Sequence, residues 1–512
     1  MSPSIRQRLQ NRKRRLFRRL ANRPWEDQAA PMFAASNIHY DLSERIRGLD
    51  CGGIGLIHLL AVQTGLIDAI NHSIHLLKVH LPYWESDHVL NIAYNILAGG
   101  DCLQDLELVR NNEVYLDALG AQRIPDPTTA GDFCRRFSQA DVLGLMEGIN
   151  SVRQTVWKQQ PPEFFKLAIL DADGTIAPTT GECKQGMEIS YDGQWGYHPL
   201  LISLANTKEP LYLVNRSGNR PSSEEAGEYF DRAITLCWVG GFQSVLLRGD
   251  TDFSQTKRLD GWNDDGVNFL FGFDATAGFK EHANGLPASA WSRLVRPPRY
   301  QVQTEPRQRP EHIKEQLVVE HEYQNIRLKS EDVAEFDYRP CGCQYLYRVV
   351  VVRKNLSVEK GELALYDDIR YFFYITNLRA ESAEQVVLLA NDRCDQENLI
   401  EQLKNGVKAL RMPVDNLVSN WAYMVMASLA WTLKAWWGLS LPVMPGRWKE
   451  RHEGQKQAVL KMEFKRFVNA VVRVPCQIIR QGRKIIYRLL AWNPWQEVLL
   501  RMAEGLRRPM RC

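Results

Sequence analysis

The chain has 512 residues, of which 45% are hydrophobic and 24% are charged. A chain of this length and composition can form several domains with substantial cores, so disorder over the whole chain is excluded. The net charge is only +4, but residues 1–25 carry nine Lys and Arg and no acidic residue, residues 446–512 carry sixteen against five Glu, and the part between them carries −16. Basic ends around an acidic middle favour a polyanionic partner held by the ends. A solvated tail would also explain either end taken alone.

The cysteines and the apolar segments bear on the compartment. The ten Cys have no repeating spacing and residues 1–25 contain no apolar signal core, so we expect reduced thiols in a cytoplasm. The pair Cys341 and Cys343 could bind zinc with His312 or His321, but no second closely spaced pair supports such a site. The apolar run 421–443 contains a lysine, a Trp-Trp pair and a proline. We interpret it as a buried core helix and expect no membrane partner.

The first third of the chain has a helical pattern. Residues 5–20 are strongly basic and could form a helix on nucleic acid or remain a solubilising tail. From residue 42 to about 158, apolar residues recur at steps of three and four, for example in 56–62, 89–97 and 142–146. Thr128 and Thr129, followed by Arg135 and Arg136, offer a helix start with basic residues. This pattern fits a helical DNA-binding domain, and it fits an ordinary helix cap equally well.

After Pro161 and Pro162 the pattern changes to α/β. A continuous apolar segment, 164–170, predicts a buried strand that leads into Asp171 and Asp173. Further strands are predicted at 200–204, 211–214, 244–248 and 268–273, and a helix is predicted at 223–239. The strand at 244–248 leads into Asp250.

The last part begins with a β-rich segment. From about 280 to 380 the helical period is absent, and 347–352 and 371–375 are typical of strands. Helices are then predicted over 391–404 and 416–437, before the basic end. On a continuous helix, Arg393, Glu397 and Lys404 would share one stripe. Taken alone, this stripe is as well explained by an exposed face with an ion pair.

Three carboxylates could meet in this arrangement. Open α/β sheets place functional groups beyond the carboxyl ends of their strands, so Asp173 and Asp250 could approach each other, and Glu397 could join them from a helix packed on the sheet. Three carboxylates suit two Mg²⁺ ions, which can act together on a phosphodiester. Without a resemblance to a known family, a turn at Asp173, a helix cap at Asp250 and a surface position for Glu397 explain the same residues.

The order and spacing of these motifs resemble a family. Arg393-x3-Glu397-x6-Lys404 matches three positions of the Tyr-x2-Arg-x3-Glu-x6-Lys signature of DDE transposases of bacterial insertion sequences, and the chain is most similar to the insertion-sequence family numbered thirteen-eighty. The tyrosine position is Ala390, which is a departure from the signature. Asp173 before Gly-Thr and Asp250 after Leu-Arg-Gly match the first and second catalytic aspartates.

The resemblance implies an α/β fold with a ribonuclease-H-like catalytic core interrupted by a β-rich insertion. An α-helical domain would precede this core and a basic helical C-terminal region would follow it. The expected parts are a basic N-terminal arm, a helical DNA-binding domain, the core's first part, the insertion, the core's second part and the basic region, over residues 1–40, 41–160, 161–279, 280–380, 381–445 and 446–512.

The implied activity is metal-dependent cleavage and strand transfer at the ends of a mobile element, with a hairpin at the element end in related enzymes. Asp173, Asp250 and Glu397 would hold two Mg²⁺ or Mn²⁺ ions, and Arg393 and Lys404 would contact DNA. The partners would be double-stranded DNA, as terminal inverted repeats and target, and a second copy in a homodimer on DNA. The location would be a bacterial cytoplasm, at the nucleoid.

Several alternatives remain open from the sequence. Asp171, Asp252 or Glu401 could replace a proposed ligand, and Asp173 and Glu397 are preferred by motif position alone. The chain could also be a catalytically inactive DNA-binding protein derived from a transposase. A third possibility is a metal-dependent DNA nuclease without strand transfer.

Overall fold

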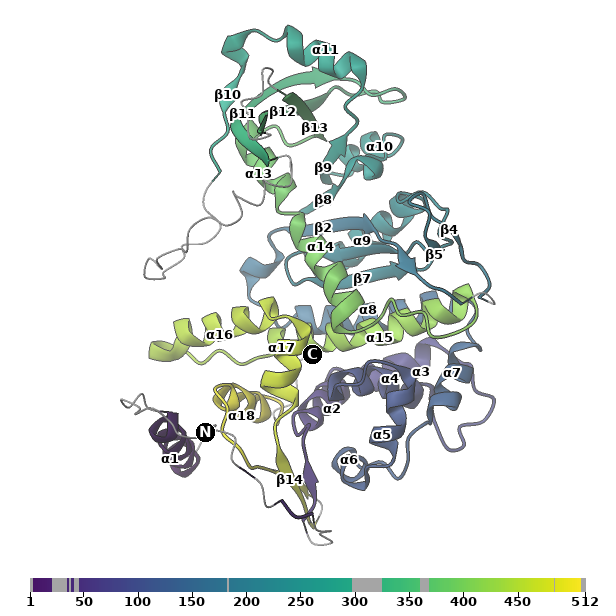
Figure 1. Cartoon of the computed structure of the whole chain (residues 1–512), viewed down its shortest axis with the longest axis vertical. Coiled ribbons are helices and arrows are strands. Elements are labelled where there is room, and N and C mark those ends of the chain that lie inside the picture. The colour runs from purple at the N-terminus through teal and green to yellow at the C-terminus, as the bar shows by residue number, and fades with distance from the viewer. Residues whose placement is uncertain are drawn as a thin grey trace. The chain divides into compact units, whose positions relative to one another are not determined.

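The computed structural model describes residues 3–20, 35, 38–40, 46–181, 184–296, 325–359, 368–482 and 484–507. The chain is mixed α/β and forms two compact units (Figure 1). The helical unit comprises Met1–Gln160, Thr179–Met187 and Glu401–Cys512. The sheet unit comprises Pro161–Pro178 and Glu188–Ile400. His312 and His321, considered above for zinc, lie outside the described residues.

The sheet unit is built on one mixed nine-stranded sheet. Part of it has the order β7-β6-β2-β8-β9, where β2 pairs antiparallel with β6 and parallel with β8. The bounds of these strands are Ala168–Gly174 (β2), Leu200–Leu204 (β6), Glu209–Val214 (β7), Val245–Gly249 (β8) and Asn268–Phe273 (β9). Every residue of β6, β7 and β8 is buried, as expected for strands covered on both faces.

The β-rich segment continues this sheet. Strand β13 pairs antiparallel with β9, and β12, β11 and β10 follow in turn. Their bounds are Ser292–Arg293 (β10), Asn325–Tyr338 (β11), Tyr347–Glu359 (β12) and Asp368–Thr376 (β13). Buried residues from both parts, including Leu246, Leu270, Val350 and Val386, form one apolar cluster. The long antiparallel strands therefore share a core with β8 and β9.

The first strand begins later than predicted. Pro161 and Pro162 lead into a 3₁₀ turn, Pro162–Phe165, instead of a strand, because proline fixes φ and has no N–H to donate. The rings of Phe164 and Phe165 pack on Phe242. The strand itself runs over Ala168–Gly174, so the two aspartates lie within the strand and not beyond it.

The predicted helix over 391–404 is not continuous. Helix α13 ends at Asn391, α14 runs over Cys394–Glu401, and Gln402–Gly406 is a π-helical turn. Asn391 Nδ2 donates to the carbonyl of Val387 at 2.6 Å, a local bond that competes with helix continuation. Arg393 thus lies in the break, and the π-turn changes the angular spacing toward Lys404. The single stripe of Arg393, Glu397 and Lys404 was therefore a wrong expectation.

Further helices cover the sheet. Helix α9 packs on β2 and β6, and α13 packs on β9, β11 and β12. The bounds of these and the neighbouring helices are Ala226–Gly240 (α9), Leu259–Asp264 (α10), Ala277–Gly285 (α11) and Ala383–Asn391 (α13).

The helical unit joins both ends of the chain. A short strand β1, Gly48–Leu49, pairs with β14, Cys476–Gln481, which pairs with β15, Lys484–Leu489. The main helices are Ile54–Gln63 (α2), Leu66–Ser73 (α3), Glu85–Ala98 (α4), Leu106–Arg110 (α5), Glu113–Leu119 (α6), Pro127–Cys134 (α7), Gln139–Trp157 (α8), Leu417–Leu439 (α15), Lys449–Lys461 (α16), Phe464–Phe467 (α17) and Gln496–Gly505 (α18). Residues 401–445, which the sequence assigned to the catalytic core, belong to this unit by their contacts. Asp126, and not Thr128, caps α7.

Helix α15 is the centre of the helical unit. It packs against α4, α8 and α16, and almost every one of its side chains is buried. Lys434 Nζ donates to the carbonyl of Leu460 at 2.8 Å and lies 4.0 Å from the centre of the Trp431 ring, which compensates its buried charge. Among the described helices, none is by itself long and apolar enough to cross a membrane, although the bent pair α2 and α3 together meets that criterion by length and composition.

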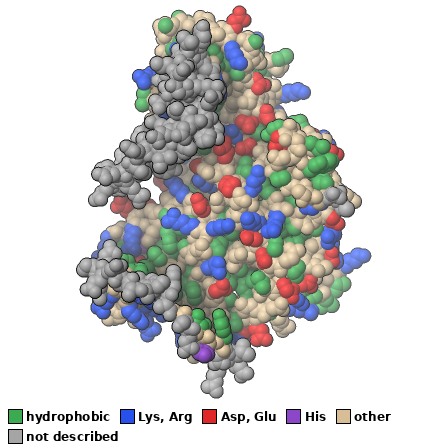
Figure 2. Space-filling view, in the orientation of Figure 1, with side chains coloured by type: hydrophobic (Ala, Val, Ile, Leu, Met, Phe, Trp, Pro, Cys, Tyr) green, Lys and Arg blue, Asp and Glu red, His purple; other side chains and the backbone are tan. Residues whose placement is uncertain are grey.

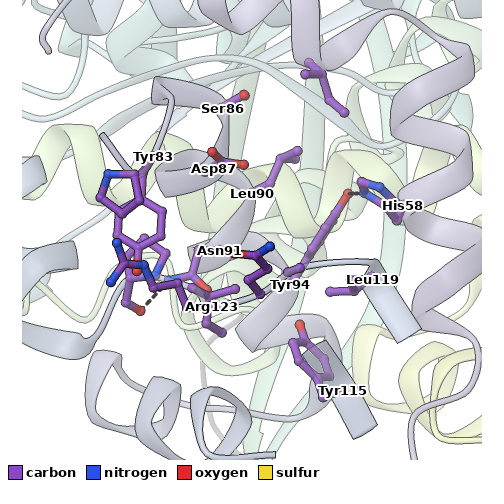
Figure 3. A pocket seen from close by; sticks show the side chains of 16 residues that line it. His58, Tyr83, Ser86, Asp87, Leu90, Asn91, Tyr94, Tyr115, Leu119 and Arg123 are labelled. Atoms are coloured by element: carbon purple, nitrogen blue, oxygen red, sulfur yellow. Dashed lines mark hydrogen bonds between the residues drawn. The ribbon is translucent and has the colours of Figure 1, made fainter. Parts of the chain in front are cut away.

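Two other features of the helical unit are visible. The N-terminal helix α1, Pro3–Leu20, carries exposed Lys and Arg side chains that form a basic patch (Figure 2). A cavity of about 440 Å³ has residues of α2, α4 and the segment 121–125 in its lining. Figure 3 shows these side chains. Tyr94 Oη lies 3.1 Å from His58 Nδ1, and Arg123 lies over the Tyr83 ring. Burial lowers the pKa of His58, so the imidazole is neutral near neutral pH.

Candidate active site

Asp173 lies on the central strand of the sheet. It is the sixth residue of β2, where it pairs with Leu201 of β6. Its side chain is 15% exposed and accepts a hydrogen bond from Arg393 Nη1 at 3.1 Å. The neighbouring strand residues Ala172 and Leu170 are fully buried on the other face. The strand thus presents Asp171 and Asp173 to one side.

Asp250 follows the adjacent parallel strand. It comes directly after β8 and caps the short turn Thr251–Phe253, with its Oδ1 accepting from the backbone N–H of Asp252 at 3.0 Å. Gly272 on β9 permits this turn, because a Cβ there would lie 2.7 Å from the Thr251 nitrogen. The cap that the sequence offered as a structural alternative is therefore real, and it leaves Asp250 beside a cavity.

Glu397 reaches the same cavity from α14. The cavity has a volume of about 400 Å³, and its lining includes Asp250, Arg393, Glu397, Ala390 and Tyr374. Tyr374 comes from β13, so a tyrosine of the β-rich segment lines the cavity where the signature tyrosine is replaced by Ala390. All of these residues belong to the sheet unit.

The electrostatics tie the three carboxylates together. Burial raises the pKa of Asp173 to about 6; Arg393 opposes the rise, whereas the charges of Asp250 and Glu397 add to it. Burial also raises the pKa of Asp250, again opposed by Arg393. Negative charges gathered in a partly buried place are costly without cations. A bound cation would therefore stabilise this cluster of carboxylates.

Asp171 is committed elsewhere. Both of its oxygens accept from Arg248, from Nε at 2.7 Å and from Nη2 at 2.8 Å, and Arg248 Nη1 donates to the carbonyl of Leu389 at 2.8 Å. The two side chains are 1% and 4% exposed. Asp171 therefore holds β2, β8 and the end of α13 together and is not free to replace Asp173.

Sequence reasoning missed Arg248 and Gln396. Gln396, next to Glu397, is buried; it accepts from the Ser203 hydroxyl, and its Nε2 lies 3.4 Å from the Leu201 carbonyl. It fixes α14 on β6. A signal for Arg248 was present, since a charged residue inside an apolar strand needs a buried partner. No local pattern would have identified Gln396.

The remaining candidates lie in different settings. Lys404 and Glu401 belong to the helical unit, and Glu401 is exposed and accepts from Asn405 Nδ2 at 2.7 Å. Asp252 contributes its backbone N–H to Asp250. The sheet unit thus brings together Asp173, Asp250, Glu397 and Arg393.

The donor chemistry of this cluster fits a hard divalent cation. Asp173, Asp250 and Glu397 offer carboxylate oxygens, which Mg²⁺ and Mn²⁺ prefer. The side chains are not closed around an ion: among the described residues, no three His, Cys, Asp or Glu lie close enough together to hold a metal. Instead, Arg393 Nη1 lies 3.1 Å from a carboxylate oxygen of Asp173. The residues fit a metal in kind, and metal binding would require that they draw together.

Comparison with known proteins supplies the family. No match was found among the curated proteins. A piggyBac transposase in a synaptic complex with hairpin DNA is 10% identical over 84% of each chain, with a TM-score of 0.33, a likeness too low to establish a shared fold. The sequence matches the family described as Transposase DDE domain group 1 over residues 50–511, which is nearly the whole chain. Members of DDE transposase families generally use divalent metal ions, and the match supports a role in transposition. The chain belongs to the DDE transposase family.

Proposed function

We propose that this protein cleaves DNA at the ends of an insertion sequence and joins the freed ends to target DNA. The observation that carries the proposal is that Asp250 and Glu397 line one cavity with Arg393, and that Arg393 bonds to Asp173, whose pKa the charges of Asp250 and Glu397 raise further. A merely structural core has no reason to gather three carboxylates with one arginine.

We further propose that the sheet is a ribonuclease-H-like core. Support comes from its central order β7-β6-β2-β8-β9, with three antiparallel strands followed by two that run parallel to the first. Asp173 lies on the first of these strands and Asp250 follows the strand parallel to it. The β-rich segment enters after β9 and returns to it through β13, before Glu397.

In this proposal Asp173, Asp250 and Glu397 hold Mg²⁺ or Mn²⁺, two ions when the site is filled. The ions would supply Lewis acidity for an in-line displacement at phosphorus. In the first reaction water adds to phosphorus, the P–O3′ bond breaks, and a 3′-hydroxyl and a 5′-phosphate result. In the second, that 3′-hydroxyl replaces the 3′-oxygen of a target phosphodiester, so bonds to phosphorus are exchanged one for one.

The chain's own residues position the substrate. Asp171, Arg248 and Gln396 hold the strands and α14 in register, which fixes the backbone that carries the carboxylates. Arg393 borders the cavity and is suited to a DNA phosphate, and Lys404 is proposed to make a further DNA contact. Basic side chains on α1 and in residues 446–512 would hold the duplex. We expect a homodimer that pairs two ends.

The test is a cleavage and joining assay with Mg²⁺ on supercoiled DNA that carries the terminal repeats. Wild-type protein should nick at the repeats and give joined products, whereas Asp250→Asn and Glu397→Gln should lose at least 100-fold in rate, about the scale of a lost catalytic group, and still shift the DNA on a gel. Glu401→Gln, one turn from Glu397, is the matched control and should cleave normally. Binding without cleavage by the wild type would favour the inactive DNA-binding protein, and cleavage without joining would favour the simple nuclease.

A further inference from the structure

Arg393 both binds Asp173 and borders the cavity. It lies in the break between α13 and α14, so its backbone is outside both helices. Its guanidinium makes a 3.1 Å bond to Asp173, yet its side chain is 20% exposed and borders the cavity that Asp250 and Glu397 line. It can therefore reach a ligand in the cavity without unfolding a helix.

Arg248 shows what a fixed arginine looks like in the same unit. It donates three hydrogen bonds of 2.7 to 2.8 Å, to both oxygens of Asp171 and to the Leu389 carbonyl, and its side chain is 4% exposed. Moving it would leave a buried carboxylate and a backbone carbonyl without partners. Arg393 makes a longer hydrogen bond, 3.1 Å, to its aspartate, and its side chain is 20% exposed.

The charges give the consequence of moving Arg393. Asp171 and Arg248 offset each other, so Asp173, Asp250 and Glu397 together with Arg393 carry two negative charges in excess. When Arg393 turns away, three remain. Once drawn together, the three carboxylates attract a divalent ion more strongly without a guanidinium among them, because the guanidinium repels the ion and is bound to an oxygen of Asp173.

We propose that Arg393 is an exchangeable counter-cation that pairs with Asp173 in the free protein and transfers to a DNA phosphate, so that DNA and divalent metal bind with positive coupling. The inference rests on the proposed function of this site. Arginine forms strong paired hydrogen bonds with phosphate, which supplies the differential interaction that such a transfer requires. The site then assembles fully on DNA, and free protein has a low affinity for the ion.

The experiment measures binding and not turnover. Ca²⁺ is titrated calorimetrically into the full-length protein with and without a duplex that carries the terminal repeat, with a titration of the duplex alone subtracted and the duplex checked on a gel afterwards. Wild-type protein should bind Ca²⁺ about tenfold more tightly with DNA. By reciprocity, Ca²⁺ should tighten DNA binding by the same factor in fluorescence anisotropy. Equal Ca²⁺ affinity with and without DNA would overturn the inference.

Two variants locate the coupling. Arg393→Ala should bind Ca²⁺ more tightly than wild type in the absence of DNA and should lose most of the coupling. Lys208→Ala is the matched control, because it removes a cation of the same unit whose Nζ lies 3.1 Å from Asp395 of α14 and not on a proposed ligand. It should behave as wild type. If Lys208→Ala matched Arg393→Ala, general charge and not exchange at Asp173 would explain the data.

The Asp250→Asn variant distinguishes a failure of the proposed metal site from a failure of the exchange by Arg393. If Asp250→Asn binds Ca²⁺ as tightly as wild type with DNA present, the carboxylates do not hold the ion and the metal assignment is wrong. If Asp250→Asn loses Ca²⁺ binding while wild type shows no coupling, the assignment stands and the exchange by Arg393 alone is excluded.

Discussion

Asp171 and Asp173, two residues apart on one strand, each bind an arginine, but the two pairs differ in burial and in bond length. Asp171 and Arg248 are almost fully buried, with a bidentate bond, and Asp173 and Arg393 are part exposed, with a bond at 3.1 Å beside a cavity. The sequence around them is similar, and both point to one side of β2. The difference lies in the partner: Arg248 comes from the adjacent strand, and Arg393 comes from a break between helices. One pair organises the unit, and the other is available for chemistry.

The largest effect should come from the buried pair. Arg248→Ala leaves Asp171 charged and buried without a partner, so we expect a loss of about 3–5 kcal/mol in the free energy of unfolding, measured by urea denaturation. The double variant Asp171→Leu with Arg248→Met should recover most of the loss, since both charges are then gone. A loss below about 1 kcal/mol for the single variant would contradict the distinction between the pairs.

The pH dependence of stability should report Asp173. Its pKa is raised from 3.8 to about 6 in the folded protein, so ionisation destabilises the fold. The contribution of protonated Asp173 to the free energy of unfolding is fully present below about pH 4 and is lost as the pH rises through about 6. In a chelating buffer, the free energy of unfolding should fall by on the order of 3 kcal/mol over this range.

Asp173→Asn tests this dependence. The difference in unfolding free energy between wild type and this variant should change over that pH window and be constant above it. A difference that is independent of pH would show that the carboxyl of Asp173 titrates normally.

The smallest effect on stability should come from the exposed pair. Arg393→Ala should lower the free energy of unfolding by about 1 kcal/mol, because the side chain of Asp173 is part exposed and can be reached by water. The same denaturation series as for Arg248→Ala gives the comparison directly. A loss as large as that for Arg248→Ala would mean that Arg393 is structural and would weigh against its exchange.

Part of the fold and of the site could be predicted from the sequence. The strands at 200–204 and 268–273 were predicted with their observed bounds, because a buried strand leaves a short uninterrupted apolar run. Asp173, Asp250 and Glu397 were selected by motif order, and the structure brings them into one unit. Their roles remain a proposal.

The sequence by itself determined the basic ends, the buried character of α15 and the two strand aspartates, because these features depend on composition and on the local spacing of apolar residues. Other features depended on contacts between residues far apart in the chain. The tertiary structure decided that Asp171 is occupied by Arg248, that Arg393 meets a carboxylate 220 residues away, and that both ends of the chain share one unit. A charge requires a partner by its chemistry, but the partner's position is set by how strands and helices pack, which no local pattern contains.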